Sequence, residues 1–373
     1  MKKVVISGTG LFTPSQSISN DELVAAFNQW VQLFNAENAQ AIEQGEIEPA
    51  RESSSEFIVK ASGIQSRFVI DKTGILDPKR MVPHIAERSN DEPSVMCQMA
   101  VAAAKEAMQR SGRTAADIDG VIVACSNMQR PYPAMAIEVQ QELGINGFAF
   151  DMNVACSSAT FGMQTAVNAI QAGSARSILM VNPEICTGHL NFRDRDSHFI
   201  FGDACTAVIF EEAEKATSNC QWEVISSKLV TSFSNNIRNN FGYLNRADET
   251  GIGAKDKLFV QEGRKVFKEV CPMVAQIIGE HLAANHIAVE DVKRFWLHQA
   301  NLNMNLLITR RLLGRDATDS EAPVILDTYA NTSSAGSVIA LHKYQEDLPS
   351  GAYGVLSSFG AGYSVGSVIL RKV

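Results

Sequence analysis

The sequence predicts an α/β protein of two related halves, each with a mostly parallel sheet covered by helices. Three observations support this prediction. The chain has 373 residues, which is long for a single hydrophobic core. Apolar strand-like runs alternate with helical patterns, as they do in parallel, covered sheets. Short features of the first half also recur in the second.

The first half, residues 1–212, is expected to begin with a strand over 2–11. A helix follows from Asn20, a plausible N-cap, and its apolar residues keep helical spacing. The polar stretch 35–55 gives no core assignment. Further strands are expected within 117–126 and at 144–150, 177–181 and 201–210, and helices at 94–111, 132–143 and 163–172.

The second half, residues 213–373, repeats features of the first. Asp117 precedes an apolar strand and then Asn127, and Asp291 precedes another strand and then Asn301 with the same ten-residue spacing. Such echoes suggest related halves whose sites face one another at strand ends. Strands are expected at 294–298, 324–326, 354–359 and 364–372, and helices at 263–285, 303–313 and 332–346.

Composition argues against several classes of protein. The net charge of −8 gives no support for binding nucleic acid or an anionic membrane. No apolar run reaches the ~20 residues that span a bilayer, and the start of the chain is typical of a strand rather than a signal peptide. The seven cysteines are scattered without Cys-x-x-Cys pairs, which favours a cytoplasmic protein without disulfides or zinc. We expect no metal and no cofactor.

The chemistry is expected to centre on Cys156, at the apex of a small-residue turn between an apolar strand and a helix. A cysteine in that place has its sulfur near the first unpaired N–H groups of the helix, which favour an anion. Because the thiolate is the nucleophilic form, the pattern predicts a reactive cysteine. A lone cysteine is more often a buried structural residue, so its partners decide between the two interpretations.

Candidate partners lie in the second half. His298 ends an apolar strand, where a side chain can emerge into a cleft, and the other six histidines lack this context. Asn331 precedes a helix, which is also compatible with an ordinary cap. Residues 358–364 form a glycine-rich loop that either donates N–H groups to an oxyanion or is a tight turn. Together these groups suit acyl transfer onto sulfur, and the local signature of a papain-like protease is absent.

Four motifs in this order resemble the β-ketoacyl-acyl-carrier-protein synthase III family of thiolase-fold condensing enzymes. They are Ala155-Cys156-Ser-Ser-Ala, His298-Gln-Ala-Asn301, Asn331-Thr-Ser-Ser-Ala and Phe359-Gly-Ala-Gly-Tyr, with Phe201-Gly-Asp as a further match. The resemblance implies a homodimer with a thiolase-like fold. That fold has two pseudo-duplicated α/β halves in a five-layered αβαβα arrangement.

The resemblance also implies a decarboxylative Claisen condensation in fatty-acid initiation or a related pathway. Cys156 would take an acyl group from acyl-CoA or acyl-carrier protein. His298 and Asn331 would stabilise the enolate formed as malonyl-carrier protein loses carbon dioxide, and this carbanion would attack the acyl-cysteine. Backbone N–H groups of Cys156 and Ala361 would hold the oxyanion, each worth ~3 kcal/mol. The product would be a 3-oxoacyl-carrier protein.

The expected substrate-binding residues follow the family less closely. Phe57 and Ala61 stand where the family usually has a tryptophan and an arginine that clamp the adenine of coenzyme A, and Arg195 matches the opposite arginine. Tyr132 matches a position that reaches the partner subunit's acyl pocket. About twenty-five residues near 29–53 look inserted, and they either shape the substrate mouth or form a surface excursion.

Carrier-protein docking is expected on the helix after the His298 motif. Arg310 and Arg311 lie there, where the resemblance implies basic residues that receive the acidic carrier protein, although a solvated basic face is an alternative. Two other functions also remain open. The first is head-to-head acyl-CoA condensation, or ketosynthase work in a specialised polyketide, aryl polyene or dialkylresorcinol pathway. The second is a non-catalytic binding partner, against which the intact Cys-His-Asn set argues.

Overall fold

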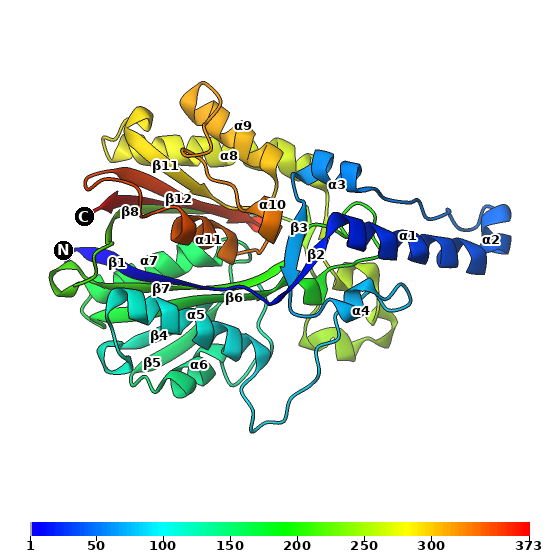
Figure 1. Ribbon diagram of the computed structural model, residues 1–373, viewed down its shortest axis with the longest axis horizontal. Helices are drawn as coiled ribbons and strands as arrows, with labels where there is room; N and C mark the ends of the chain where they lie inside the picture. Colours follow the sequence, from blue (N-terminus) through cyan, green and yellow to red (C-terminus); the bar gives the residue numbers. More distant parts are fainter. Residues whose placement is uncertain (1) are drawn as a thin grey trace.

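The computed structural model describes residues 2–373, and within them nine strands pair in the order β11-β12-β13-β8-β1-β7-β6-β4-β5. Their bounds are β1 (Val4–Phe12), β4 (Gly120–Ala124), β5 (Phe148–Met152), β6 (Ser177–Ile185), β7 (Asp203–Glu212), β8 (Trp222–Ser234), β11 (Val292–Leu297), β12 (Tyr353–Gly360) and β13 (Gly362–Lys372). Strands β1 and β8 share a short register of two residue pairs, Val5–Glu223 and Ile6–Trp222. The strands of the two halves therefore separate into two stacked sheets (Figure 1).

The pairing of strands repeats in the two halves. In the first half β4 is parallel to β6, β6 is antiparallel to β7, and β7 is antiparallel to β1. In the second half β11, β12, β13 and β8 pair in the same sequence of directions. Parallel neighbours need a long crossover, so a repeated order of this kind reflects a repeated topology. The predicted pair of duplicated α/β halves is confirmed, while their boundary at residue 212 stays a prediction. The expectation of mostly parallel sheets is wrong, because three of the pairs among these nine strands are parallel and five are antiparallel.

Helices cover both sheets and fill the space between them (Figure 1). Helices α5 (Val95–Ser111) and α6 (Met135–Leu143) contact the first sheet, and α8 (Gly263–Ala284) contacts the second, with α9 (Leu302–Leu313) against it. Helices α7 (Ser158–Gln171) and α11 (Ala335–Lys343) contact both sheets. The predicted five-layered αβαβα arrangement is therefore confirmed.

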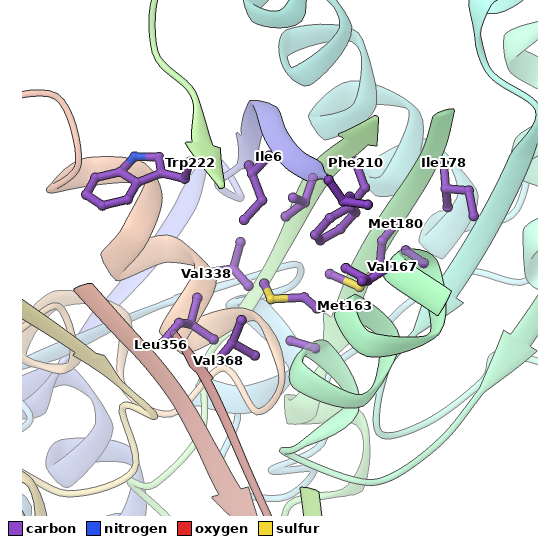
Figure 2. Packing of buried hydrophobic residues seen from close by; sticks show 14 of the residues in the cluster. Ile6, Met163, Val167, Ile178, Met180, Phe210, Trp222, Val338, Leu356 and Val368 are labelled. Carbon is purple, nitrogen blue, oxygen red and sulfur yellow. The ribbon is translucent and has the colours of Figure 1, made fainter. Parts of the chain in front are cut away.

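The central layer brings α7 very close to the first sheet. Figure 2 shows Met163 and Val338 lying between Phe210 of one sheet and Leu356 of the other, all fully buried. A Cβ atom on Gly162 would lie 2.6 Å from the sulfur of Met180, so this position has no room for a side chain. The tight packing fixes the first turn of α7, and with it the residue that precedes the helix.

The insertion predicted near 29–53 extends α1 (Asn20–Glu37) away from the body and returns through α2 (Ala39–Glu43) (Figure 1). Two asparagines on α1 bind the returning backbone. The Asn28 amide exchanges two hydrogen bonds with Ser53 at 2.9 and 3.1 Å, and the Asn35 amide exchanges two with Ala50 at 2.8 and 3.0 Å. The polar stretch that gave no core assignment is therefore held by side-chain pairing with the backbone.

The remaining elements are short. They are β2 (Gln16–Ser19), α3 (Ser55–Ser62), β3 (Ser66–Val69), α4 (Thr73–Leu76), β9 (Ile237–Arg238), β10 (Val260–Gln261) and α10 (Leu326–Tyr329).

The predicted strand at 324–326 is wrong, because Gln299 Oε1 accepts the N–H groups of Ile325 and Leu326, and the chain enters α10. The sequence patterns did not predict strand β8, over Trp222–Ser234. Among residues 2–373, no helix combines the length and the apolar character needed to cross a bilayer.

Candidate active site

A cavity of about 750 Å³ opens where the two central helices begin. Cys156, which precedes α7, lines it together with Asn331, which precedes α11. His298, directly after β11, and Gly360, at the end of β12, also line it. The structure therefore brings together the cysteine, histidine and asparagine that lie far apart in the sequence.

The turn that carries Cys156 is strained and tightly bonded. Ala155, just before the cysteine, has a φ of 46°, which is uncommon for a residue with a side chain. Asn153 Oδ1 accepts the N–H of Ala155, and Ser158 Oγ accepts the N–H of Val154, both at 2.8 Å. The backbone N–H of Cys156 lies beside its own sulfur and lowers the pKa of the thiol in part.

The Cys156 thiol is protonated at neutral pH. Burial, with a smaller contribution from the nearby Glu184 carboxyl, raises its pKa to about 11. The Ser333 hydroxyl, 3.4 Å from Sγ, lowers the pKa in part. This result differs from the expected ease of thiolate formation, since desolvation outweighs the favourable end of α7. The thiolate must therefore form during the reaction rather than before it.

His298 is a neutral imidazole. It is buried next to Phe359, whose ring meets it edge-on with centroids 5.3 Å apart. Burial lowers the pKa of His298 to about 4, and the backbone of Ser333 opposes this shift in part. The Nδ1 atom is buried without a hydrogen-bond partner among the described residues. The other ring nitrogen, Nε2, is therefore the one that can reach the cavity.

Asn331 presents its amide NH₂ to the cavity. The N–H of Ser333 donates to Asn331 Oδ1 at 2.8 Å, which fixes which end of the amide faces the protein. The backbone of Asn331 bonds Ile200 and Gly202, at 2.9 and 3.1 Å. The predicted Phe201-Gly-Asp segment thus holds this asparagine in place. Ala330, just before it, has a φ of 54°.

The glycine-rich loop approaches the cysteine at Gly360 rather than at Ala361. A Cβ atom on Gly360 would lie 2.7 Å from Cys156 Cβ and 3.1 Å from its sulfur, so only glycine fits there. Ala361 connects β12 to β13 and lines a second cavity of about 480 Å³ beside the cysteine turn. Glycine at position 360 lets the loop pass directly beside the cysteine, and the assignment of an oxyanion N–H to Ala361 stays a prediction.

Sequence reasoning missed Glu184 and its partners. This carboxylate is buried and accepts the N–H and the hydroxyl of Ser126 at 2.9 and 2.5 Å. It also accepts the N–H of Ser334 at 3.1 Å and the hydroxyl of Ser334. Glu184 thus ties the first half to the turn that carries Asn331. The sequence does contain one sign of this role, because Glu184 is a charged residue within the otherwise apolar strand β6.

The two residues of the predicted adenine clamp, Phe57 and Arg195, contact each other directly. The guanidinium carbon of Arg195 lies 4.1 Å from the centre of the Phe57 ring, and its Nε donates to the carbonyl of Glu52 at 2.7 Å. Neither Phe57 nor Arg195 lines the catalytic cavity, whereas Ala61 does. These contacts join Arg195 to α3 and to the end of the insertion instead of leaving a slot between ring and guanidinium.

The other predicted binding residues lie outside the cavity lining. Tyr132 is 82% exposed, so its ring is free to contact another molecule. Arg310 forms an ion pair with Asp316 at 2.6 Å, and Arg311 is exposed on the same helix. Lys255 and Arg264, which the sequence analysis did not single out, are exposed and do line the cavity.

The chain matches two family models. The 3-oxoacyl-[acyl-carrier-protein] synthase III model covers residues 150–232, and the C-terminal model of the same enzymes covers 282–372. The β-ketodecanoyl-[acyl-carrier-protein] synthase of Pseudomonas aeruginosa PAO1 is 75% identical over 93% of this chain and 99% of its own. The chain belongs to the β-ketoacyl-[acyl-carrier-protein] synthase III family. This synthase is therefore an acyltransferase of the condensing-enzyme type.

More distant relatives share the fold over the whole chain. The β-ketoacyl-[acyl-carrier-protein] synthase III of Granulibacter bethesdensis is 28% identical over all of both chains. The crystal structure of the Aquifex aeolicus VF5 synthase III has a TM-score of 0.77 at 22% identity, covering 99% of each chain. The structure of Xanthomonas campestris OleA has a TM-score of 0.74 at 16% identity with the same coverage, which shows a common fold alone.

Proposed function

We propose that this synthase condenses a medium-chain acyl thioester with malonyl-carrier protein, losing carbon dioxide and forming a 3-oxoacyl-carrier protein. One observation carries the proposal: Cys156, His298 and Asn331, from opposite halves of the chain, line one cavity. A sulfur nucleophile beside two neutral hydrogen-bond donors suits acyl transfer followed by attack of an enolate.

In the first step Cys156 takes the acyl group. The thiol loses its proton, the sulfur attacks the thioester carbonyl, and the leaving thiolate is protonated as it departs. The developing oxyanion is held by the N–H of Cys156 and by a second N–H of the loop at Gly360 and Ala361. Losing one such donor costs ~3 kcal/mol.

In the second step His298 and Asn331 stabilise the enolate of the malonyl thioester. As the carbon–carbon bond to the carboxylate breaks, charge moves to the thioester oxygen. A neutral imidazole and an amide NH₂ can both donate to that oxygen without a metal ion. The enolate carbon then attacks the acyl-cysteine, the sulfur–carbon bond breaks, and Cys156 leaves as a thiolate.

The acyl donor is proposed to carry eight carbons. The name of the Pseudomonas aeruginosa relative states a ten-carbon product, and malonate contributes two carbons after losing carbon dioxide. A cavity of about 750 Å³ has room for such a chain. Lys255 and Arg264 at the cavity lining suit the phosphate of a phosphopantetheine arm, which coenzyme A and carrier protein share.

The insertion is proposed to brace one wall of the cavity. Arg195 is bound by Glu52 of the insertion and by Phe57 of α3, while its neighbours Asp194 and Asp196 line the cavity. Deleting residues 37–48 should therefore change the preference among acyl donors. An unchanged preference in a folded deletion variant would leave the insertion as a surface excursion.

The partners of this synthase are proposed to be an acyl carrier protein and a second copy of the chain. The exposed ring of Tyr132 is available to reach a partner subunit's acyl pocket, as the family resemblance implies. Arg311 and, less freely, the ion-paired Arg310 would receive an acidic carrier protein. All seven cysteines are free, which fits the reducing environment of the cytoplasm.

Intact-mass measurement after incubation with acyl-CoAs and acyl-carrier proteins of several lengths tests the proposed function. We expect an eight-carbon adduct on Cys156 that is absent from Cys156→Ala, and condensation on adding malonyl-carrier protein. Consumption of long acyl-CoA without malonyl-carrier protein would favour head-to-head condensation instead. Folded protein without any Cys156-dependent adduct would contradict the proposal.

A further inference from the structure

The hydroxyl of Ser333 lies against the sulfur of Cys156 and has no part in the scheme above. Its Oγ is 3.4 Å from Sγ, within hydrogen-bond distance for sulfur. Ser333 is 2% exposed and does not line the cavity, so its hydroxyl approaches the sulfur from the protein side. A substrate entering from the cavity would leave this contact in place.

The position of this hydroxyl is fixed by its neighbours in the turn. Ser333 has a φ of 49°, a conformation that is strained for a residue other than glycine. Its N–H is held by Asn331 Oδ1, and the next residue, Ser334, is held by the carboxylate of Glu184. Such strain persists where the surrounding contacts determine the conformation, and here they aim a hydroxyl at the nucleophile.

We propose that Ser333 is a further catalytic residue, which donates a hydrogen bond from its hydroxyl to the Cys156 sulfur and stabilises the thiolate. The proposal rests on the proposed role of Cys156 as nucleophile. The thiolate exists twice in each cycle: when the sulfur attacks the donor carbonyl, and when it leaves after carbon–carbon bond formation. In acyl transfer the proton of the thiol ends on the departing pantetheine thiol, and after condensation the released thiolate takes a proton from water. Ser333 keeps its own proton throughout.

The other groups around the sulfur do not supply this stabilisation. Glu184 on β6 raises the pKa of Cys156, and His298 after β11 is uncharged because burial lowers its pKa to about 4. The neighbouring thiols of Cys125 and Cys186 stay protonated, since burial raises their pKa values. Ser333 is the side chain whose contact lowers the pKa of the nucleophile, and the backbone N–H of Cys156 itself makes a smaller contribution in the same direction.

The pH dependence of alkylation tests the proposal without any substrate. Iodoacetamide labelling of Cys156, followed by peptide mass mapping from pH 6 to 10, reports the thiolate fraction. In Ser333→Ala we expect the profile to shift about one unit to higher pH, so the rate at fixed pH falls roughly tenfold. Alanine already adopts a positive φ at Ala155 and Ala330 of this chain, 46° and 54°.

Ser157→Ala is the matched control. Its hydroxyl is also buried beside Cys156, but it donates to the carbonyl of Ser364 at 3.1 Å and not to the sulfur. We expect its alkylation profile to match the unmodified protein. Ser333→Gly removes the same hydroxyl while fitting the positive φ, so it replaces Ser333→Ala if that variant does not fold.

Equal profiles for the unmodified protein and a folded Ser333 variant would overturn the proposal. So would an equal shift in the Ser157 control, because the effect would then be structural. Neither outcome depends on the acyl donor or on condensation activity. A failure here is therefore distinguishable from a failure of the proposed function, which the acyl-adduct measurement tests.

Discussion

The two central helices are preceded by the same kind of turn and carry different chemistry. In the first half Ala155, with a φ of 46°, stands directly before Cys156 at the start of α7. In the second half Ala330, with a φ of 54°, stands directly before Asn331 ahead of α11. Both turns open onto one cavity. The duplicated fold thus offers two similar positions, one holding a cysteine and the other an asparagine.

The strands ahead of these helices show where the halves diverge. His298 follows β11, and the ten-residue echo places Ala124 at the corresponding site in the first half. The first half instead contributes Glu184, whose carboxylate holds Ser126 of its own half and Ser334 of the other. We therefore expect Cys156 of the first half to be essential for acyl transfer, and His298 and Asn331 of the second half to be essential for decarboxylation, so substitutions should separate the two steps.

The largest effect is expected from Cys156→Ala, which removes the nucleophile of the first half. Condensation should fall by at least about 10³-fold, because no acyl-enzyme can form. Steady-state formation of the 3-oxoacyl product measures this loss. Condensation at an undiminished rate would show that the turn before α7 does not carry the nucleophile.

His298→Ala and Asn331→Ala are expected to impair the second half. Each should reduce carbon dioxide release from malonyl-carrier protein by roughly 10²–10³-fold, as removal of an oxyanion donor does. Acylation of Cys156, followed by intact mass, should continue in both variants. Loss of acylation in folded protein would mean that the halves do not divide the reaction as proposed.

The two half-reactions should respond differently to pH. The Cys156 thiol, with its pKa raised to about 11, gains thiolate as pH increases, so acylation should rise up to tenfold per unit between pH 6 and 8. His298, with its pKa lowered to about 4, stays neutral above pH 5, so decarboxylation should be flat over the same range. Stopped assays of each half-reaction across pH 5–8 would show parallel profiles if this contrast is wrong.

The smallest effects are expected from the strained alanines. Ala155→Val and Ala330→Val should each destabilise the fold by about 1–3 kcal/mol, because a β-branched residue tolerates positive φ poorly. The glycine variants at both positions should be neutral or slightly stabilising. Thermal unfolding of the four variants checks whether the two turns are equivalent; an unaffected valine variant would remove that equivalence.

Buried histidines in both halves should make the free energy of unfolding depend on pH in the acid range. His198 and His298 have pKa values lowered to about 4 by burial, against about 6.5 in the unfolded chain. The unfolded state therefore binds more protons between these values, and stability is lost as pH falls from 6.5 towards 4. The loss is roughly 3 kcal/mol for each fully buried histidine.

The three candidate catalytic residues that line the cavity were predictable because short motifs with a chemical reason encode them. Cys156 lies in a small-residue turn, His298 ends an apolar strand, and Asn331 precedes a helix. Their meeting in one cavity depends on the duplicated fold, which the alternation of strands and helices predicted. The repeated pairing of strands explains why residues from two halves face each other.

Other features depend on long-range contacts that no local pattern reveals. Strand β8 mixes polar and apolar residues, a pattern that is also typical of a surface segment. Its place in the sheet depends on pairing with β13 and β1, which are distant in the sequence. Residues 324–326 have strand-like composition, but Gln299 directs them into a helix. The raised pKa of Cys156 arises from burial by both halves, and Ser333 meets the sulfur across 177 residues of sequence.

Carbon dioxide release by Cys156→Ala tests the central claim most directly, because it isolates the second half from the nucleophile. With malonyl-carrier protein as sole substrate, the variant should still release carbon dioxide, and adding Asn331→Ala should abolish that release. A folded Cys156→Ala variant that releases none would show that the amide and imidazole cannot act alone. The division of labour between the two turns would then be wrong.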